Sequence, residues 1–263
     1  MAHSSSPPFD DLAAGYDAAF ADSSIGREMR AIVWRRLDAL FRPGMRIIEL
    51  NCGTGEDAVH LASRGVDVTA TDSSPAMLAL AERKAARSGV SGSLHFKRLA
   101  IEHLGGFGHG GAFHGVVSNF GGLNCVENLA DTARAIHACL APNGIAALCV
   151  MGRYVPWEWL WYLARGDAAR AFRRLRGDGV PWRGITLRYP SPGQLARLFA
   201  PWFRLERTSA VGLFVPPTYA EEFVRRHPRL FRALAACERR AEGFGQAAWL
   251  SDHYLAEFRK RPD

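Results

Sequence analysis

Short apolar runs alternate with helical segments over the first 150 residues, and this alternation restricts the fold more than any other feature of the chain. Parallel strands buried on both faces have sequences of this kind, bounded by Gly, Pro or Asn. Strands are expected at 45–50, 66–71, 94–99, 113–118 and 145–151. Amphipathic helices lie between them, one of them running from the Ser74-Pro75 cap to about residue 87. This order predicts a mostly parallel sheet with helices on both faces.

The pattern changes after Met151. An aromatic, arginine-rich stretch covers 152–190, a capped helix begins at Ser191, and strands are expected at 203–210 and 253–259. Periodicity predicts one long helix over 218–243. An apolar stripe at helical spacing also runs through 157–175, and we interpret it as a packed lid or a dimer face in preference to a membrane-surface helix. A homodimer is therefore a candidate assembly.

Composition sets the broad class. The 263 residues are 48% hydrophobic and 22% charged, which suits one elaborated α/β unit with a sizeable core. Five scattered cysteines without a C-x-x-C pair argue against a disulfide framework or a zinc site. The N-terminus has no charged leader before an apolar stretch, and the apolar run at 145–151 is far too short to span a membrane. We therefore expect a cytoplasmic protein.

A glycine turn follows the first expected strand, in the sequence E-L-N-C-G-T-G-E-D at 49–57. Glycines at such a turn let the backbone approach a ligand closely. The second expected strand is followed by Asp72, about 20 residues beyond the turn, where a carboxylate can accept hydrogen bonds from both hydroxyls of a ribose. The two features together indicate a nucleoside site.

Two nucleoside cofactors compete for this pattern, because the sequence at 53–58 also fits the dinucleotide fingerprint G-x-G-x-x-A. A pyrophosphate needs a helix N-terminus without competing negative charge, whereas Glu49, Glu56 and Asp57 bracket this turn. S-adenosylmethionine (AdoMet) carries a sulfonium and an ammonium against one carboxylate, so the acidic turn attracts it. AdoMet is favoured, and NAD remains an alternative.

Between residues 9 and 153 the chain resembles the class I AdoMet-dependent methyltransferases of small-molecule type, with E-x-N-C-G-T-G standing for their E/D-x-G-x-G-x-G motif. The resemblance includes Tyr16-Asp17, the sequence T-D-S-S-P-A-M-L at 71–78 and the L-A-P-N-G turn at 140–144. It implies a doubly wound, Rossmann-like, mostly parallel seven-stranded sheet with an antiparallel last strand and helical cap insertions.

The resemblance also implies how the chain is divided. One methyltransferase domain would span 1–263, with an N-terminal helical lid at 1–42 and an AdoMet-binding core at 43–151. A cap insertion at 152–190 and a C-terminal part at 191–263, which holds a second cap helix within 212–252, would follow. The lid and both caps would meet over the carboxyl edge of the sheet, where open α/β sheets bind their ligands.

The same resemblance assigns site residues. Glu49 and the glycine turn would line the methionine part of AdoMet, Asp72 would take the ribose, and Met77 would pack on the adenine. The full set assigned to the cofactor is Tyr16, Arg30, Glu49, Asn51, Gly53, Gly55, Asp72, Ser73, Met77, Ile101, Glu102, Ser118 and Asn119. Tyr16 and His253 are the catalytic candidates, His253 as a base at the active edge.

Two residues depart from the family pattern. Asn51 replaces the first glycine of the motif, which is tolerable because Asn adopts left-handed backbone more readily than most residues. Ala100 stands where these enzymes often carry an Asp for the adenine amino group. The backbone of Ile101 or the side chain of Glu102 would serve instead.

The caps suggest the acceptor. Five of the seven tryptophans, at 157, 159, 161, 182 and 249, lie in the two later segments. Eight arginines against three acidic residues between 152 and 190 place five of the seven net positive charges there. These features predict a small acceptor, aromatic or anionic.

Several acceptor and cofactor classes are not expected. The chain has neither a Pro-Cys dipeptide nor the N-P-P-Y/F/W motif of nucleic-acid methyltransferases, and no carboxylate pair follows the fourth expected strand. We therefore expect no nucleic-acid acceptor and no metal. Three alternatives stay open: an RNA-directed methyltransferase that uses the arginines, a nonenzymatic AdoMet-binding protein, and an NAD-dependent enzyme.

Overall fold

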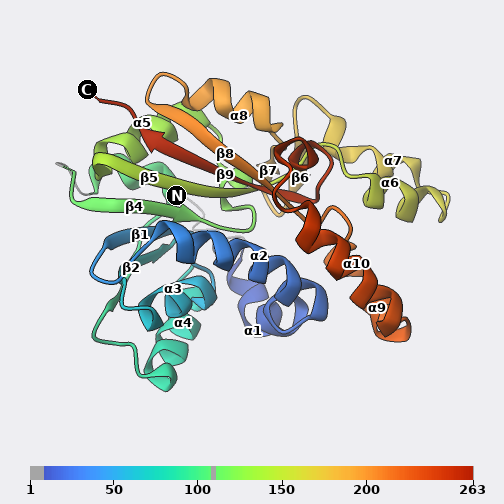
Figure 1. Cartoon of the computed structure of the whole chain (residues 1–263), viewed down its shortest axis with the longest axis horizontal. Coiled ribbons are helices and arrows are strands. Elements are labelled where there is room, and N and C mark those ends of the chain that lie inside the picture. Colours follow the sequence, from blue (N-terminus) through green and yellow to red (C-terminus); the bar gives the residue numbers. More distant parts are fainter. Residues whose placement is uncertain (1–8, 108–110, 263) are drawn as a thin grey trace, which may run out of the picture.

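A computed structural model of the chain describes residues 9–107 and 111–262, so the first residues of the expected lid lie outside the described part. Its main sheet has seven strands in the order β3-β2-β1-β4-β5-β9-β8 (Figure 1). The strands are β1 (Arg46–Leu50), β2 (Asp67–Asp72), β3 (Leu94–Arg98), β4 (Phe113–Ser118), β5 (Leu140–Met151), β8 (Phe203–Val211) and β9 (His253–Lys260). Only β9 runs antiparallel to its neighbours, β5 and β8. The predicted sheet and its antiparallel last strand are confirmed.

Helices cover both faces of the sheet, with α2, α3 and α4 below it and α5 and α8 above it in the view of Figure 1. The helices are α1 (Ala13–Tyr16), α2 (Ser24–Leu40), α3 (Glu56–Ser63), α4 (Pro75–Ser88), α5 (Leu129–Cys139), α6 (Pro156–Leu163), α7 (Ala168–Ala171), α8 (Pro192–Phe199), α9 (Glu221–Arg226) and α10 (Pro228–Ala241). Predicted caps start two of them: Ser74 accepts from Met77 N at α4, and Ser191 forms a capping box with Gln194 at α8.

Two hydrophobic clusters lie on the two faces of the sheet. Ile47 and Ile48 are neighbours in β1 and both are fully buried, but side chains alternate along a strand, so each belongs to a different cluster. Ile47 packs with α2, α3 and α4, and Ile48 packs with α5 and α8. The sheet is therefore buried on both faces, which is the reason its strands read as continuous apolar runs.

The predicted single helix over 218–243 is wrong. The segment forms a 3-10 turn at Thr218–Ala220, then α9, then α10, with a break at His227. Pro228 occupies the first turn of α10 and disfavours helical backbone in the residue before it, so the helix restarts there.

The predicted helix through 157–175 is also interrupted. Gly166 has φ +75° and follows α6, and the chain continues as α7 and a 3-10 turn at Arg173–Leu175. Leu160 and Phe172 of the stripe are exposed, so the rest of the described chain does not cover that face as a continuous lid.

Two strand features escaped sequence analysis. β5 begins at Leu140, ahead of the expected 145, and its pairing with β4 jumps from Leu140 to Ile145 across Asn143, whose φ is +60°. A separate hairpin, β6 (Val180–Trp182) and β7 (Ile185–Leu187), lies inside the 152–190 insertion. Its strands are three residues long, too short for an alternating pattern to be read with confidence.

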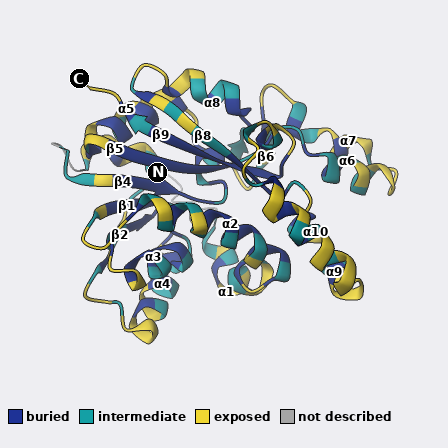
Figure 2. Ribbon diagram, in the orientation of Figure 1, coloured by how far each residue is buried: buried dark blue, intermediate teal, exposed yellow. Residues whose placement is uncertain are grey.

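The helices of the two later segments extend from one end of the sheet (Figure 1), and Figure 2 shows that their outer faces are largely exposed. Among the described residues, no helix combines the length and apolar character needed to cross a membrane.

Candidate active site

Loops at the carboxyl ends of β1, β2 and β4 enclose a cavity of ≈ 610 Å³, within the range of roughly 300–1,000 Å³ typical of small-molecule sites. Its floor comprises the turn after β1, Asp72 and Ser73 at the end of β2, residues 99–102 and residues 119–122. Its roof comes from distant segments: Phe9, Leu12 and Tyr16 of the N-terminal region, the β6–β7 hairpin, and Thr218. Residues from the N-terminal region, the insertion and the later connection thus all line this cavity.

The turn after β1 has left-handed backbone at three positions. Asn51, Gly53 and Gly55 have φ values of +55°, +54° and +81°. A Cβ on Gly55 would lie 2.8 Å from the Cβ of Ala81, so only glycine lets the turn pack on α4. The ring of Tyr16 packs against Gly53. A Cβ at this position would lie 4.0 Å from Tyr16 Cε1, which is van der Waals contact.

The side chain of Asn51 makes two hydrogen bonds to the end of β4 and the residue after it. Its Nδ2 donates to the carbonyl oxygen of Asn119 at 2.8 Å, and its Oδ1 accepts from the Ser118 hydroxyl at 2.6 Å. A Cβ on Gly122 would fall 2.0 Å from Asn51 Cγ, so this glycine makes room for the amide. The replacement of the motif glycine therefore ties the turn after β1 to the end of β4.

Asp72 closes the other side of the turn. Its two carboxylate oxygens accept from the backbone N–H groups of Gly53 and Ser74, each at 2.9 Å. Burial raises the pKa of the Asp72 carboxyl, and the backbone N–H groups oppose that rise. The carboxylate lines the cavity with accepting capacity left for a ligand hydroxyl.

A buried ion pair forms the polar end of the cavity. Arg30 of α2 donates to Asp57 of α3 at 2.6 Å, and Trp34 and Asn119 also donate to that carboxylate, at 2.6 and 2.9 Å. The Arg30 guanidinium lies over the ring of Phe120, 4.9 Å from its centroid. Arg30, Asp57 and Asn119 all line the cavity, so this network presents a fixed cation to a ligand there.

Glu49 lies behind this network and is 1% exposed. Its Oε2 has no hydrogen-bond partner among the described residues. Burial, with the charges of Asp57 and Asp72, raises the pKa of Glu49 well above its usual range, although Arg30 opposes the rise. An unpartnered buried carboxyl of this kind is stabilised in its charged form by a cation or a donor on the cavity side.

The N-terminal segment is fastened over the cavity by polar contacts. The Thr54 hydroxyl donates to Asp17, the Ser74 hydroxyl donates to Asp10, and Lys84 of α4 pairs with Asp17 at 2.9 Å. Burial raises the pKa of Tyr16, so its hydroxyl stays protonated near neutral pH. Tyr16 can therefore donate a hydrogen bond into the cavity but is a poor base.

The opposite end of the cavity is apolar. Phe120, Val126 and Met151 line it from the sheet edge, and Trp182 and Leu187 line it from the hairpin. The Trp182 ring packs on Phe9 at 5.1 Å between centroids. Of the eight arginines between 152 and 190, none appears among the residues described as lining this cavity. The aromatic character expected of the caps reaches the cavity through Trp182 alone of the five tryptophans.

His253 does not line the cavity. Its ring packs edge-on against Phe120, 5.5 Å between centroids, and its Nδ1 lies 3.2 Å from Asp252. Asp252 also accepts from Arg174 at 2.7 Å; although burial opposes it, that arginine holds the pKa of the carboxyl below its usual range. His253 is thus separated from the cavity by Phe120, whose ring it contacts.

The structure brings most of the proposed cofactor residues to one cavity. Those that line it are Tyr16, Arg30, Asn51, Gly53, Asp72, Ser73, Met77, Ile101, Glu102 and Asn119. Glu49, Gly55 and Ser118 lie behind the lining and hold it in shape. Sequence analysis missed the anchoring role of Asp57 and the hairpin residues Ile185 and Leu187. A polar residue on the first turn of the helix after the glycine turn was the available signal for Asp57.

The residues present fit AdoMet. The guanidinium of Arg30 lines the cavity and suits the methionine carboxylate. Glu49 lies behind the lining, and its unpartnered oxygen leaves an acceptor for a donor on the cavity side. Asp72 suits the ribose hydroxyls, and Met77 with Ile101 offers apolar surface to an adenine. A dinucleotide pyrophosphate would meet Glu56 and Asp57 at the start of α3 instead.

The chain is also similar in sequence to known methyltransferases. Residues 47–144 match the sequence profile of the family described as Methyltransferase domain. The chain is 35% identical over 144 residues to a demethylmenaquinone methyltransferase of Thermus thermophilus, covering 52% of this chain and 60% of that protein. It is 29% identical over 113 residues to a ubiquinone biosynthesis O-methyltransferase of Psychrobacter cryohalolentis, covering 42% of each. It therefore spans less than two thirds of the length of these relatives.

A solved structure shares the fold. The AdoMet-dependent methyltransferase from Mesorhizobium loti superposes with a TM-score of 0.55 at 18% identity, over 87% of this chain and 97% of that one. The seven-stranded sheet with its antiparallel last strand, the Glu49–Asp57 turn and the profile match agree. Residues 47–144 of the chain thus match the methyltransferase domain family, and the sheet has the Rossmann-like fold of the class I, AdoMet-dependent methyltransferases.

Proposed function

We propose that this protein transfers the methyl group of AdoMet to a small organic acceptor with an apolar, aromatic body. The observation that carries the proposal is the division of one cavity into a charged end at Arg30, Asp57 and Asp72 and an apolar end at Phe120, Met151 and Trp182. A cation-bearing nucleoside fits the first end, and a flat apolar molecule fits the second.

The proposed mechanism is metal-independent in-line displacement. AdoMet supplies an activated methyl group on its sulfonium when it is bound. Arg30, Asp72 and the turn at Gly53 hold the cofactor in one orientation, and the apolar end excludes water and aligns the acceptor. Orientation of this kind can supply roughly 7–11 kcal/mol in favourable cases.

Few side chains near the cavity could accept a proton from the acceptor. Tyr16 is proposed to donate a hydrogen bond near the cofactor, since its raised pKa keeps it neutral. Burial raises the pKa of the Cys125 thiol to about 11, so that residue is also protonated near neutral pH. His253 lies behind Phe120, and the lining of the cavity gives no support to proton removal by it. We propose that His253 is a positioning residue that fixes the Phe120 ring.

The relatives suggest which acceptors to test first. One is named for ubiquinone biosynthesis and another for demethylmenaquinone, so hydroxylated aromatic compounds head the panel. The test is transfer of a labelled methyl from AdoMet to catechols, hydroquinones and other small aromatic and anionic metabolites, with transcribed RNA as a separate arm. Methylation of a small aromatic acceptor supports the proposal. Methylation of RNA alone, or no transfer to any acceptor by protein that binds AdoMet, would overturn it.

A further inference from the structure

Helices α6 and α7 project from one end of the sheet and leave apolar side chains exposed (Figure 1). Leu160 is 67% exposed, Leu163 46% and Phe172 43%. Successive helical residues turn by about 100°, so Trp159, Leu160 and Leu163 lie within about 100° of one another around α6. The Trp159 ring also lies 6.0 Å from the Phe172 ring between centroids. These four side chains form one surface, which we call the α6–α7 apolar patch.

The opposite side of α6 attaches the helix to the protein. Glu158 is buried there and pairs with Arg173 and Arg174, each at 2.8 Å. The Trp161 ring packs on Tyr219, 5.6 Å between centroids. The patch is therefore not the face by which α6 packs on the rest of the described chain. Single exposed leucines are common on protein surfaces, whereas a contiguous apolar patch marks an interaction site.

The chain around the patch is basic. Between residues 160 and 176 the sequence has five arginines and a single acidic residue, Asp167. Arg165, Arg170 and Arg176 are exposed. Asp167 caps α7 by accepting from the backbone N–H of Arg170 at 2.9 Å, and its side chain is only 33% exposed. The patch is thus accompanied by exposed positive charge that is poorly compensated.

A second basic segment reaches the same end of the molecule. In Figure 1, α9 and the α6–α7 pair both extend to the end away from the C-terminus. Leu230, in the first turn of α10, is 47% exposed, and Arg229 and Arg232 beside it are exposed as well. Apolar and basic side chains are therefore combined on both projections.

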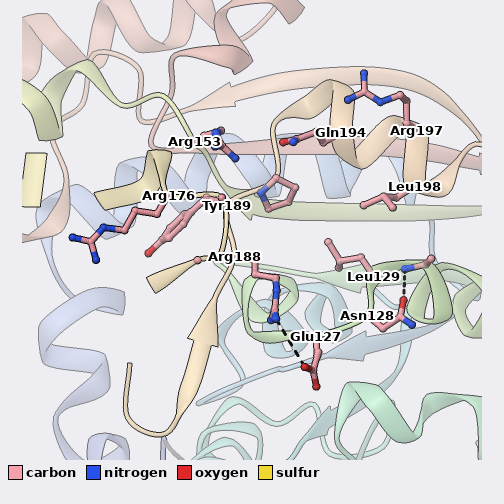
Figure 3. Close-up of a pocket in the computed structure, with 14 residues that line it drawn as sticks. Glu127, Asn128, Leu129, Arg153, Arg176, Arg188, Tyr189, Gln194, Arg197 and Leu198 are labelled. Atoms are coloured by element: carbon pink, nitrogen blue, oxygen red, sulfur yellow. Dashed lines mark hydrogen bonds and ion pairs between the residues drawn. The ribbon is translucent and has the colours of Figure 1, made fainter. Parts of the chain in front are cut away.

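The arginines of the 152–190 insertion do not converge on one point. Figure 3 shows Arg176 extending away from Arg188 and Arg197, although all three line one hollow of ≈ 500 Å³. A small anion could not reach them together. An extended anionic surface attracts each arginine that comes near it, so it does not require them to converge.

We propose that the α6–α7 apolar patch docks on an anionic lipid bilayer. Leu160, Leu163 and Phe172 would enter the boundary between headgroups and acyl chains, and the exposed arginines would contact the lipid phosphates. Apolar insertion and basic charge each give weak binding alone, and together they hold a protein at a membrane surface. The inference does not depend on methyl transfer, because it concerns a separate set of side chains.

This proposal reverses the preference for a lid or a dimer face that periodicity suggested. The exposure of Leu160 and Phe172 argues against a lid. A two-fold dimer through the patch would bring the arginines of one copy toward the same arginines of the other, and like charges repel. RNA would be attracted by the arginines but would give the exposed leucines no apolar contact surface.

The test is co-sedimentation of the purified full chain with vesicles of phosphatidylcholine alone and of phosphatidylcholine mixed with phosphatidylglycerol. Binding to the mixed vesicles, weakened by added salt, is expected, with much weaker binding to phosphatidylcholine alone. The variant L160Q/L163Q should lower partitioning into the mixed vesicles about tenfold or more. Because both leucines are exposed, its melting temperature should match that of the wild type.

The charge variant is R170Q, which should lower partitioning several-fold. Its matched control is R134Q on α5. Arg170 and Arg134 are both 66% exposed, and each pairs with an aspartate three residues earlier. L198Q on α8 is the control for the leucines, since Leu198 is 39% exposed. Figure 1 shows α5 and α8 over the sheet, away from α6 and α7, so both controls should partition normally.

Several results would overturn the proposal. They are the absence of binding to the mixed vesicles, binding that L160Q/L163Q leaves unchanged, and equal losses in R170Q and R134Q. A dimer that L160Q/L163Q dissociates, or binding of RNA without binding of vesicles, would assign the patch to another partner. None of these results depends on turnover, so they are independent of the proposed function.

Discussion

Arg30 and Asp57 meet at 2.6 Å with their side chains only 7% and 6% exposed, and both line the cavity assigned to the cofactor. Residues on two different helices thus form one rigid polar group at the edge of the sheet. A charge pair this deep is costly to break, because removal of one partner leaves the other buried and uncompensated. The pair therefore links the stability of the fold to the shape of the site.

The variant D57N should lower both stability and cofactor affinity. Arg30 would lose its counter-charge, so the free energy of unfolding should fall by about 3 kcal/mol. Affinity for AdoMet should fall about tenfold or more as Arg30 loses its fixed position. Denaturant unfolding and calorimetry measure the two effects. The control is D38N. Asp38 of α2 is partly exposed and pairs with His60 and Arg64, so its loss should lower the free energy of unfolding by less than about 1 kcal/mol. Equal effects in the two variants would contradict the argument.

The variant D72A should weaken AdoMet binding while the sheet stays intact. Hydrogen bonds to charged groups contribute about 1.5–3 kcal/mol each, so the loss in affinity should be about tenfold or greater. D67N, at the exposed start of the same strand, is the matched control and should bind normally. Unchanged affinity in a folded D72A protein would remove the ribose contact from the account.

The variant E49Q should be more stable than the wild type at neutral and alkaline pH yet bind AdoMet less tightly. Because burial raises the pKa of Glu49 above its ordinary 4.5, the folded protein holds this proton more firmly than the unfolded chain does. Its contribution to stability is present below pH 4.5 and is lost as pH rises through the raised pKa. The melting temperature of ligand-free E49Q minus that of the wild type should therefore grow with pH. A difference that shrinks with rising pH would contradict the assignment.

The variant H253N tests the positioning role. If His253 fixes Phe120, KM for the acceptor should rise several-fold, kcat should change less, and the pH profile of kcat should keep its shape. A collapse of kcat with loss of one limb of the pH profile would instead identify His253 as a base. Phe120→Leu is the companion variant, and it should raise the same KM because it removes the ring that His253 contacts.

Much of the core could be predicted because its information is local. The turn at Gly53, the cap at Ser74 and the acid at Asp72 each lie within a few residues of a strand end, and parallel strands bring those ends together. The antiparallel last strand followed from the family resemblance and was confirmed.

The peripheral segments could not be predicted in the same way, since their form depends on distant contacts. The β6–β7 hairpin is held to the sheet by Asn124, which bonds both Arg188 and Met151, and no local pattern encodes that contact. The arginines near it were correctly recognised as a cluster. Their separation from the cofactor cavity is set by the path of the chain between Arg176 and Arg188, which only the structure shows.

The central claim is that an acid-flanked glycine turn binds a cationic nucleoside. Its most direct test is calorimetric titration of the wild-type protein with AdoMet and, separately, with NAD⁺. The account predicts saturable binding of AdoMet with one molecule per chain and no measurable binding of NAD⁺. Binding of NAD⁺ in preference to AdoMet would contradict it.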